Sequence, residues 1–426
     1  MQLPQMATVE QQFDAPRVES IAETVHAQIR NLNLSGKIRP GDSMAITAGS
    51  RGIANIGPII AATVDAVRTA GAEPFIVPAM GSHGGGTAAG QVEVLAGLGI
   101  TEESVKAPIR ATMDTVVVTK TAGGVPVHFD RLASEADHVL IVNRVKPHTR
   151  FVGPIESGLH KMMLIGLGKH EGASIYHRAI LAYSFPEILA DVARVVLEKC
   201  RVIGGLALVE NALDETALIE AVHPDDFASR EAELLKQAVA WLPALPVAEC
   251  DLLIVDQIGK DISGAGMDTN VVGRKFFDHM ATSEDRVSCR RILVRSLTKK
   301  TNGNACGIGL AEFTTQRCVD QVDPVKTGIN CITALHPEGA MIPITFSTDR
   351  EAVEAALKTI GLTEPQDAKV IHIQDTLHLD VVRASAACLT EIRNTGNCRI
   401  VGEVYPMPFD ADGRLTGLQD PGGPRG

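Results

Sequence analysis

Residues 143–177 hold the densest group of side chains in the chain that could carry out chemistry. Four of the thirteen histidines lie in this stretch, together with three lysines and two arginines. An imidazole titrates near neutral pH, so it can take up and return a proton. The stretch directly follows the apolar run 139–142, which is typical of a buried strand. We therefore expect a reaction site just beyond the end of a strand.

Two histidines are candidates for proton transfer. His83 lies in the glycine-rich sequence Gly-Ser-His-Gly-Gly-Gly-Thr at 81–87. This loop could instead be a phosphate-binding turn in which the histidine is incidental. His148 follows Pro147, whose fixed backbone angle stiffens the chain that aims the side chain. The alternative for His148 is a strand-end histidine that is hydrogen-bonded to backbone.

Lys161 precedes a run of apolar residues, which predicts partial burial. A buried lysine loses its charge more easily and can act as a nucleophile or as an attachment point. It could equally be a helix lysine whose stem packs while its ammonium group reaches water. Arg51 suits a carboxylate partner through its planar guanidinium group, unless it is a surface arginine. Possible metal ligands are His160, His170 and His177, although there is no His-Glu-x-x-His motif.

A repeated pattern of strand, glycine-rich loop and helix would position these residues. Strands are predicted at 44–47 and 74–78, with helices at 56–69 and 88–98. This is the βαβ pattern of a largely parallel sheet, in which ligands bind at the carboxyl ends of the strands. Arg51, His83 and His148 each follow a predicted strand, so they could converge at one edge of the sheet.

The length of 426 residues exceeds what one hydrophobic core usually holds. We predict an α/β protein of two α/β domains with largely parallel sheets and an active-site cleft between them. The first domain, at 1–245, would carry catalysis and cofactor binding. The second would occupy 248–400, after a boundary marked by two prolines. A polar tail at 401–426 could pack back on the first domain.

The second domain opens with a predicted strand at 252–255 and a glycine-rich loop at 259–266. Gln257, Lys260 and Asp268 could all face a ligand beyond that strand. A plain connection between strand and helix explains the same residues about as well. The sequence therefore leaves both interpretations open here.

Composition excludes several classes of protein. Forty basic residues against fifty-one acidic ones give a net charge of −11, which argues against nucleic-acid binding. No apolar stretch approaches the roughly 20 residues that span a bilayer, and no signal peptide is visible. The eight cysteines are scattered without a Cys-x-x-Cys pair, which predicts reduced thiols and a cytoplasmic location.

Five features in a fixed order resemble a known family. They are Arg51, Gly-Ser-His at 81–83, Lys-Pro-His at 146–148, Ser-Gly-Leu-His-Lys at 157–161, and His177. This order resembles that of the lactate racemase family, whose members use a nickel-pincer nucleotide. The resemblance covers most of the first predicted domain and extends more loosely into the second.

The resemblance implies a role for each matching residue. His83 and His148 are similar to the paired acid/base histidines of the family. Lys161 is similar to the lysine that holds the pyridinium-derived cofactor through a thioamide. His177 is similar to the protein ligand to nickel. The residues that resemble the substrate-binding set are Arg51, Gln257 and Lys260.

By this resemblance the protein is an isomerase that racemises or epimerises a small 2-hydroxy acid, and it depends on the enzymes that make its cofactor. Two positions depart from the family pattern: Ala48 replaces an acidic residue and Asp256 replaces a tyrosine. The spacing from His148 to Lys161 is also longer than expected. These departures favour a 2-hydroxy acid other than lactate. The alternatives are a nucleotide-dependent dehydrogenase or lyase, and a non-catalytic member that binds a small carboxylate.

Overall fold

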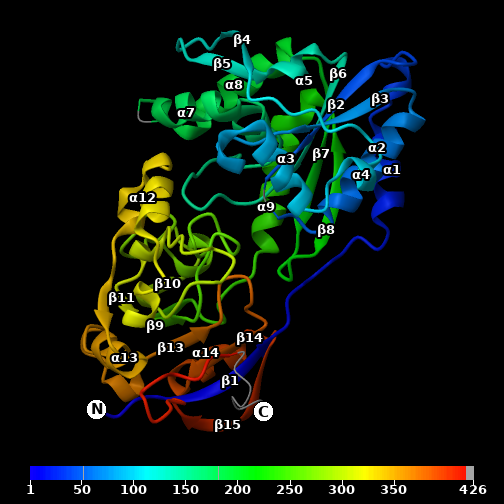
Figure 1. Ribbon diagram of the computed structural model, residues 1–426. Coiled ribbons are helices and arrows are strands. Elements are labelled where there is room, and N and C mark those ends of the chain that lie inside the picture. The colour runs from blue at the N-terminus through cyan, green and yellow to red at the C-terminus, as the bar shows by residue number, and fades with distance from the viewer. Residues whose placement is uncertain (51, 181, 419–426) are drawn as a thin grey trace. The chain divides into compact units, whose positions relative to one another are not determined.

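The computed structural model describes residues 1–50, 52–180 and 182–418. The chain divides into two compact units, whose helices and strands are labelled in Figure 1. Unit 2 consists of Ala15–Leu242, and unit 1 combines Met1–Asp14 with the chain from Pro243 onward. Unit 2 is thus inserted into the sequence of unit 1, between Asp14 and Pro243.

Unit 2 is built on a five-stranded sheet in the order β3-β2-β6-β7-β8. The first four strands run parallel, and only β8 is antiparallel to its neighbour. The strands of this sheet are β2 (Ser43–Ala48), β3 (Glu73–Pro78), β6 (His138–Arg144), β7 (Val202–Glu210) and β8 (Thr216–Val222). A separate hairpin pairs β4 (Thr115–Lys120) with β5 (Pro126–Asp130).

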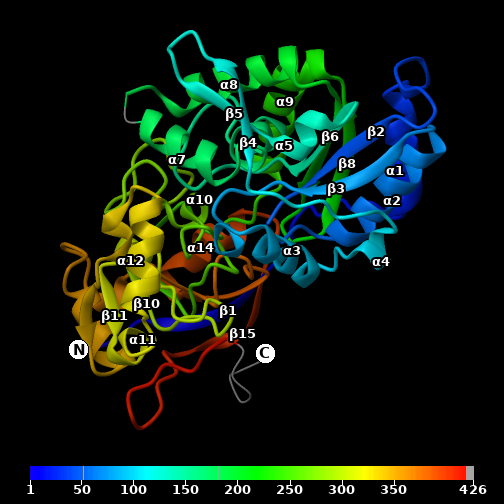
Figure 2. The same cartoon turned by 45° about the horizontal axis from the view of Figure 1, so that its top comes forward.

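Helices bury both faces of this sheet. Met44 and Ile46 of β2 pack into the cluster that includes α1 and α2, whereas Ala45 packs into the cluster that includes α8 and α9. Burial on both faces explains why these strands are almost continuously apolar. Figure 2 shows α1 and α2 side by side, as Figure 1 does. The helices are α1 (Ile21–Asn31), α2 (Ile56–Thr69), α3 (Ala88–Gly97), α4 (Glu102–Val105), α5 (Arg131–Glu135), α6 (Leu159–Lys161), the π-helix η3 (Met162–Gly166), α7 (Lys169–Ala179), α8 (Phe185–Lys199) and α9 (Phe227–Ala240).

Unit 1 contains an eight-stranded mixed sheet in the order β12-β11-β10-β9-β13-β14-β1-β15. The strands from β12 to β13 are parallel, and those from β13 to β15 are antiparallel. The strands are β1 (Gln5–Gln11), β9 (Glu249–Val255), β10 (Ser288–Val294), β11 (Phe313–Thr315), β12 (Ile344–Phe346), β13 (Val370–Ile373), β14 (Val381–Ser385) and β15 (Cys398–Pro406). The helices are α10 (Thr269–Val272), α11 (Gln316–Val319), α12 (Pro324–Thr333), α13 (Asp349–Leu357) and α14 (Leu389–Asn394).

The predicted fold class, an α/β protein with largely parallel sheets, is confirmed. The extents of the units differ from the prediction at both ends of the chain. Residues 1–14 lie in unit 1, because β1 pairs with both β14 and β15. Residues 401–406, predicted as part of a tail over the first domain, are instead the end of β15. Local sequence patterns do not reveal strand partners that lie almost a chain length apart.

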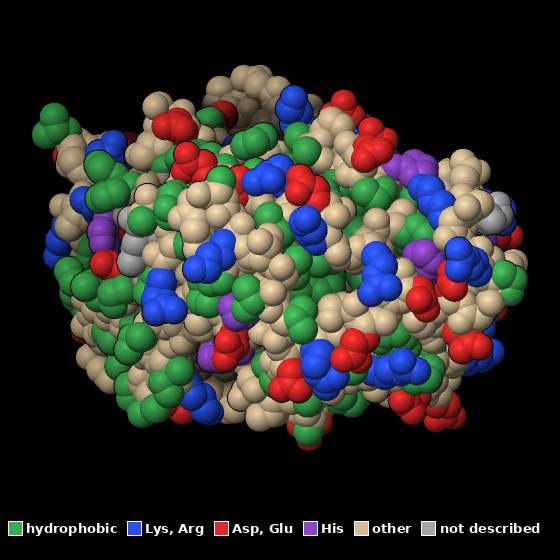
Figure 3. Space-filling model, turned by 90° about the horizontal axis from the view of Figure 1, so that it is seen from above, with side chains coloured by type: hydrophobic (Ala, Val, Ile, Leu, Met, Phe, Trp, Pro, Cys, Tyr) green, Lys and Arg blue, Asp and Glu red, His purple; other side chains and the backbone are tan. Residues whose placement is uncertain are grey.

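On the face shown in Figure 3, acidic and basic side chains are interspersed and do not gather into a patch of one sign. Within residues 1–50, 52–180 and 182–418, none of the helices combines the length and the apolar character needed to cross a bilayer.

Candidate functional site

The sheet of unit 2 brings two of the predicted strand-end residues to one edge. Strands β3, β2 and β6 are neighbours and run parallel, so their carboxyl ends meet at the same edge. His83 follows β3, and His148 follows β6. Arg51, which follows β2, lies outside the described residues. The predicted convergence of the His83 and His148 loops at one sheet edge therefore agrees with the strand order.

The loop that carries His83 depends on glycine. Gly84, Gly85 and Gly86 all have positive φ values, between 64° and 67°. At Gly84 a Cβ atom would lie 2.3 Å from the carbonyl carbon of Gly90, in the first turn of α3. A side chain at this position would therefore clash with backbone. The glycines let the loop fold tightly against α3, which fixes the backbone that follows His83.

A buried polar network holds the start of the same loop. The Gln91 side chain donates to the carbonyls of Met80 (2.9 Å) and Gly81 (3.1 Å). Lys169 in turn donates to Oε1 of Gln91 at 3.1 Å, and its Nζ lies 3.1 Å from Oδ2 of Asp130. The Lys169 and Asp130 side chains have no exposed surface. This network ties the segment before His83 to α7 and β5.

Burial governs the protonation of the pair in this network. Burial lowers the pKa of Lys169, and the nearby Asp130 carboxylate opposes that shift. Burial likewise raises the pKa of Asp130, against the effect of Lys169. Sequence patterns do not predict this pair, because Lys169 stands among the polar residues 169–171 and Asp130 ends an ordinary strand. A fully buried lysine is uncommon unless it is paired.

His148 is held by backbone amides and by an aromatic stack. Its Nδ1 accepts hydrogen bonds from the backbone amides of Arg150 and Phe151, each at 3.1 Å. Its own amide donates to Glu156 at 2.7 Å. The imidazole stacks on Phe151 with a centroid distance of 4.5 Å, and Phe151 stacks on Phe185 at 4.1 Å. Since Nδ1 is an acceptor, the neutral ring carries its proton on Nε2.

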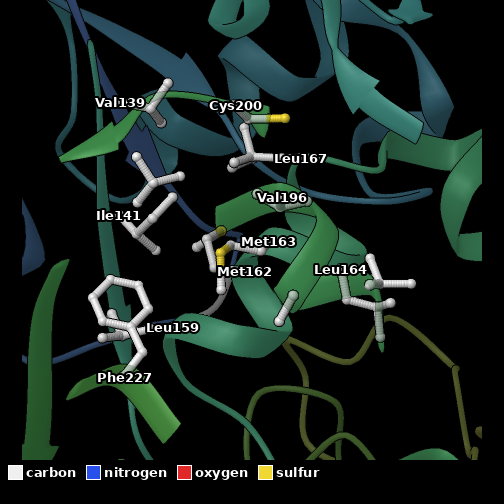
Figure 4. Close-up of a cluster of buried hydrophobic side chains, with 14 of the residues drawn as sticks. Val139, Ile141, Leu159, Met162, Met163, Leu164, Leu167, Val196, Cys200 and Phe227 are labelled. Atoms are coloured by element: carbon white, nitrogen blue, oxygen red, sulfur yellow. The ribbon is translucent and has the colours of Figure 1, made fainter. Parts of the chain in front are cut away.

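Lys161 ends the short helix α6, and a π-helix follows it directly. Leu159, Met162 and Met163 are buried around it, and Figure 4 shows them among the core side chains. A single-turn π-helix within a helical segment frequently marks a functional site. The Lys161 side chain itself is half-buried. The predicted partial burial of Lys161 is therefore confirmed.

The start of α6 is fixed by contacts to neighbouring elements. Asn143 at the end of β6 donates to the Gly158 carbonyl at 2.7 Å. Gly158 has φ of 93°, and a Cβ atom there would lie 2.3 Å from Oε1 of Glu231. The buried Glu231 carboxylate accepts from the His160 amide (3.2 Å) and pairs with His160 Nδ1 (2.8 Å). These contacts orient the turn that presents Lys161.

His177 lies near Lys161. Burial lowers the pKa of His177, and the positive charge of Lys161 lowers it further. His177 is on α7, one turn after Ala173, and a Cβ atom on Gly81 would lie 3.2 Å from the Cβ of Ala173. The loop that leads to His83 thus packs against the helix that carries His177. Lys161, His177 and the His83 loop share one region of unit 2.

The other histidines proposed as metal ligands have different environments. His160 is buried and hydrogen-bonded to Glu231, which is a structural role. His170 is exposed. Among the residues that the structure describes, no group of three His, Cys, Asp or Glu side chains could hold a metal ion.

The candidates in unit 1 follow strand β9. Gln257 is exposed, and its backbone amide donates to the backbone carbonyl of Gln374 at 2.9 Å. The Lys260 ammonium donates to Oδ1 of Asn330 at 2.8 Å and to the Gly264 carbonyl. Asp268 is buried and caps α10, so its contacts identify it as a structural residue. Gln257 and Lys260 as substrate-binding residues stay a prediction.

Asp256, the residue that replaces the family's tyrosine, belongs to a buried ionic network. Its Oδ1 lies 2.6 Å from Nε2 of His372 and pairs with Arg295, and its Oδ2 accepts from the Leu418 amide at 3.1 Å. Burial acts to raise the pKa of Asp256, but His372 and Arg295 together hold it well below its usual range. Arg295 also pairs with Asp349 at 2.7 Å. These contacts give Asp256 a structural role in unit 1.

The fold and the site of unit 2 define an α/β protein with a lysine, a histidine of lowered pKa and two strand-end histidines near one sheet edge. The family model of the lactate racemase N-terminal domain matches residues 5–185. All four residues lie within that range. The resemblance to the lactate racemase family is therefore confirmed over residues 5–185.

A solved structure shows the same fold. The lactate racemase apoprotein from Thermoanaerobacterium thermosaccharolyticum is 14% identical, with a TM-score of 0.53, over 86% of this chain and 94% of that one. At this identity the likeness concerns the fold alone. A protein from Thermotoga maritima, also 14% identical, aligns over 67% of this chain and 72% of its own with a TM-score of 0.45. Among curated protein sequences, none matches this chain.

Proposed function

We propose that this protein is an isomerase that racemises or epimerises a 2-hydroxy acid with a nickel-pincer nucleotide attached to Lys161. The observation that carries the proposal is the proximity of Lys161 to His177, whose pKa is lowered in part by the lysine's charge. The attachment point and the metal ligand of one cofactor must lie close together. Both residues fall within the stretch that matches the lactate racemase N-terminal domain.

The residues of unit 2 fit such a cofactor. A lowered pKa favours the neutral form of His177, and only a neutral imidazole can bind a metal ion. Lys161 is presented by a turn whose start is fixed by Asn143 and Glu231. Lys161 would hold the nucleotide and His177 would bind the nickel. When bound, the cofactor supplies an electron-poor centre that can accept a hydride from the substrate carbon and give it back.

His83 and His148 would move the proton of the substrate hydroxyl. A reaction that inverts a carbon centre needs one base for each face, and the two histidines follow strands that flank β2. The hydrogen bonds at Nδ1 leave Nε2 of His148 as the nitrogen that carries the exchangeable proton. Before His148 accepts a proton at Nε2, its own proton must move to Nδ1, which breaks both amide bonds. In the described conformation His148 therefore offers a proton donor to a substrate oxygen.

The substrate would be a 2-hydroxy acid other than lactate. Ala48, at the end of β2, is buried and offers only a methyl group where the family pattern has a carboxylate. Arg51, Gln257 and Lys260 would bind the substrate carboxylate and hydroxyl groups. Cationic and amide groups suit these partners through charge-assisted hydrogen bonds.

Cofactor loading tests the proposal directly. The full chain would be produced together with the cofactor-making enzymes and nickel, and its intact mass and peptide map would be measured. We expect a covalent adduct on Lys161 that Lys161→Arg abolishes. The exposed Lys199 gives a matched control, since Lys199→Arg should leave the adduct unchanged.

The same measurement separates the alternatives. Unmodified Lys161 in every peptide from the loaded protein would contradict the proposal. Reversible nucleotide binding without covalent mass would favour a dehydrogenase or lyase. An adduct together with no turnover of any 2-hydroxy acid would favour a non-catalytic member of the family.

A further inference from the structure

Unit 1 holds two cysteines that the proposed reaction does not use. Cys306 lies in a loop at 301–307, and Cys331 lies near the end of α12. The Ala305 amide donates to Oγ1 of Thr327 at 3.0 Å, one helical turn before Cys331. This bond holds the loop against α12, one turn of the helix from Cys331. The two thiols share a side-chain hydrogen bond.

Two basic side chains adjoin this pair. Lys260 donates to Oδ1 of Asn330, the residue before Cys331, at 2.8 Å. His336 donates its backbone amide to the Cys331 carbonyl at 2.9 Å, and its Nε2 lies 2.7 Å from Oδ2 of Asp278. These contacts place both Lys260 and His336 close to Cys331.

These neighbours separate the protonation states of the two thiols. The hydrogen bond from Cys331, with the charges of Lys260 and His336, lowers the pKa of Cys306 to about 6 although burial opposes the shift. The same hydrogen bond, reinforced by burial, raises the pKa of Cys331. At neutral pH the pair thus holds a thiolate on Cys306 and a thiol on Cys331. A thiolate is the nucleophilic form of cysteine.

Other cysteines of the chain lack this arrangement. Burial raises the pKa of Cys200 to about 12 and that of Cys318 to about 11. Cys250 and Cys289 also lie close together, with their sulfurs 3.3 Å apart, but they are buried between neighbouring strands of the core. The hydrogen bond with Cys289 and burial raise the pKa of Cys250. Two adjacent sulfurs alone therefore do not produce a thiolate here.

We propose that Cys306 is a peroxide-reactive residue and that Cys331 converts its oxidised form to a disulfide. The Cys306 thiolate attacks one oxygen of the peroxide, an S–O bond forms, the O–O bond breaks, and the released hydroxide takes up a proton to give water. The Cys331 sulfur, as it gives up its proton, then attacks the Cys306 sulfur. An S–S bond forms, the S–O bond breaks, and a second water leaves. Two thiols are oxidised and one peroxide is reduced.

Because Lys260 adjoins the two cysteines, their oxidation changes the charge beside Lys260. Oxidation removes the negative thiolate from beside an ammonium group that the proposed function assigns to substrate binding. That consequence rests on the proposed function, whereas the oxidation itself does not. The two are tested by different measurements, because thiol oxidation is read from peptide masses in unit 1 and cofactor loading from Lys161 in unit 2.

Competition between cysteines of the native chain is the primary test. The full-length protein would receive hydrogen peroxide below one equivalent at pH 7, followed by alkylation of remaining thiols and peptide mass spectrometry. Cys306 is only 5% exposed, whereas Cys398 is more accessible. We expect a Cys306–Cys331 linked peptide to appear before any oxidation of Cys398. Oxidation of Cys398 first, or unmodified Cys306 throughout, would overturn the proposal, and neither result depends on a variant that might misfold.

Two variants then assign the roles of the pair. Cys331→Ser should stop the reaction at the sulfenic acid of Cys306, which a 1,3-diketone probe traps. Lys260→Met should slow oxidation of Cys306 several-fold at pH 7, because a neighbouring positive charge is lost. A Cys306 peptide that resists the probe in folded Cys331→Ser, or an unchanged rate in Lys260→Met, would contradict the assigned roles.

Discussion

Each unit buries charged side chains close to the ends of its parallel strands, but the two networks hold different parts of the chain. In unit 2, Lys169 and Asp130 form a single ion pair that fixes the loop leading to His83. In unit 1, Asp349 alone pairs with both Arg295 and Arg317. The Leu415 amide also donates to Asp349 at 2.9 Å. One network therefore holds the loop that leads to His83, and the other anchors the segment after β15.

This comparison shows that a charged residue beyond a strand end need not face a ligand. Asp256 and His83 both follow a parallel strand, and the resemblance to the family places both positions near the substrate. Asp256 is buried against His372 and Arg295, whereas His83 is half-buried in a glycine loop. His372 and Arg295 come from elements distant in sequence from Asp256, so its surroundings depend on tertiary structure.

Removing Asp349 should produce the largest effect. Asp349→Ala leaves Arg295 buried with one partner fewer and takes away the acceptor of the Leu415 amide. We expect a loss of about 3–5 kcal/mol in the free energy of unfolding, measured by urea denaturation. Glu135→Ala, which breaks an exposed pair with Arg131, is the matched control and should have little effect. Equal effects of the two variants would show that the unit 1 network adds nothing to stability.

Lys169→Met should have a somewhat smaller effect. It leaves one buried carboxylate, Asp130, which can take up a proton, so the expected loss is about 3 kcal/mol. The double variant with Asp130→Asn should recover part of this loss, because no buried charge then remains. Urea denaturation of the two single variants and the double variant gives the coupling energy. Additive losses would mean that Lys169 and Asp130 do not interact.

The contribution of Asp256 to the pH dependence of the free energy of unfolding should be the smallest of the three effects. Its pKa is depressed in the folded protein, so it stabilises the fold above the ordinary aspartate pKa of about 3.9 and loses this contribution as pH falls toward its depressed value. Between pH 5 and pH 3 the wild-type protein should lose about 1 kcal/mol that Asp256→Asn does not lose. Denaturant unfolding at both pH values measures the difference. Parallel losses in the two proteins would contradict a depressed pKa.

The parts of the fold that the sequence revealed are those with local signals. The strand, glycine loop and helix pattern located β2, β3 and the loops after them, because apolar runs and glycines are visible within a few residues. The strand end before His148 and the half-burial of Lys161 were recognised in the same way. Convergence of the strand-end loops at one edge was expected from a general property of parallel sheets, and the observed order β3-β2-β6 agrees with it.

The features that the sequence did not reveal depend on distant partners. The pairing of β1 with β14 and β15 joins residues from opposite ends of the chain. Gln91 and Lys169 have no periodic pattern that would predict complete burial. The lowered pKa of Cys306 depends on Cys331 and Lys260, which come from separate segments. In each case the decisive neighbour lies tens to hundreds of residues away.

Strand β1 has a consequence for the order of events during synthesis. It precedes unit 2 in the chain, whereas its two hydrogen-bonding neighbours, β14 and β15, follow unit 2. Domains generally fold as units while the chain elongates, so Ala15–Leu242 can complete its core before β1 finds a partner. Until then both edges of β1 are open, and nascent-chain chaperones are suited to shield such a segment.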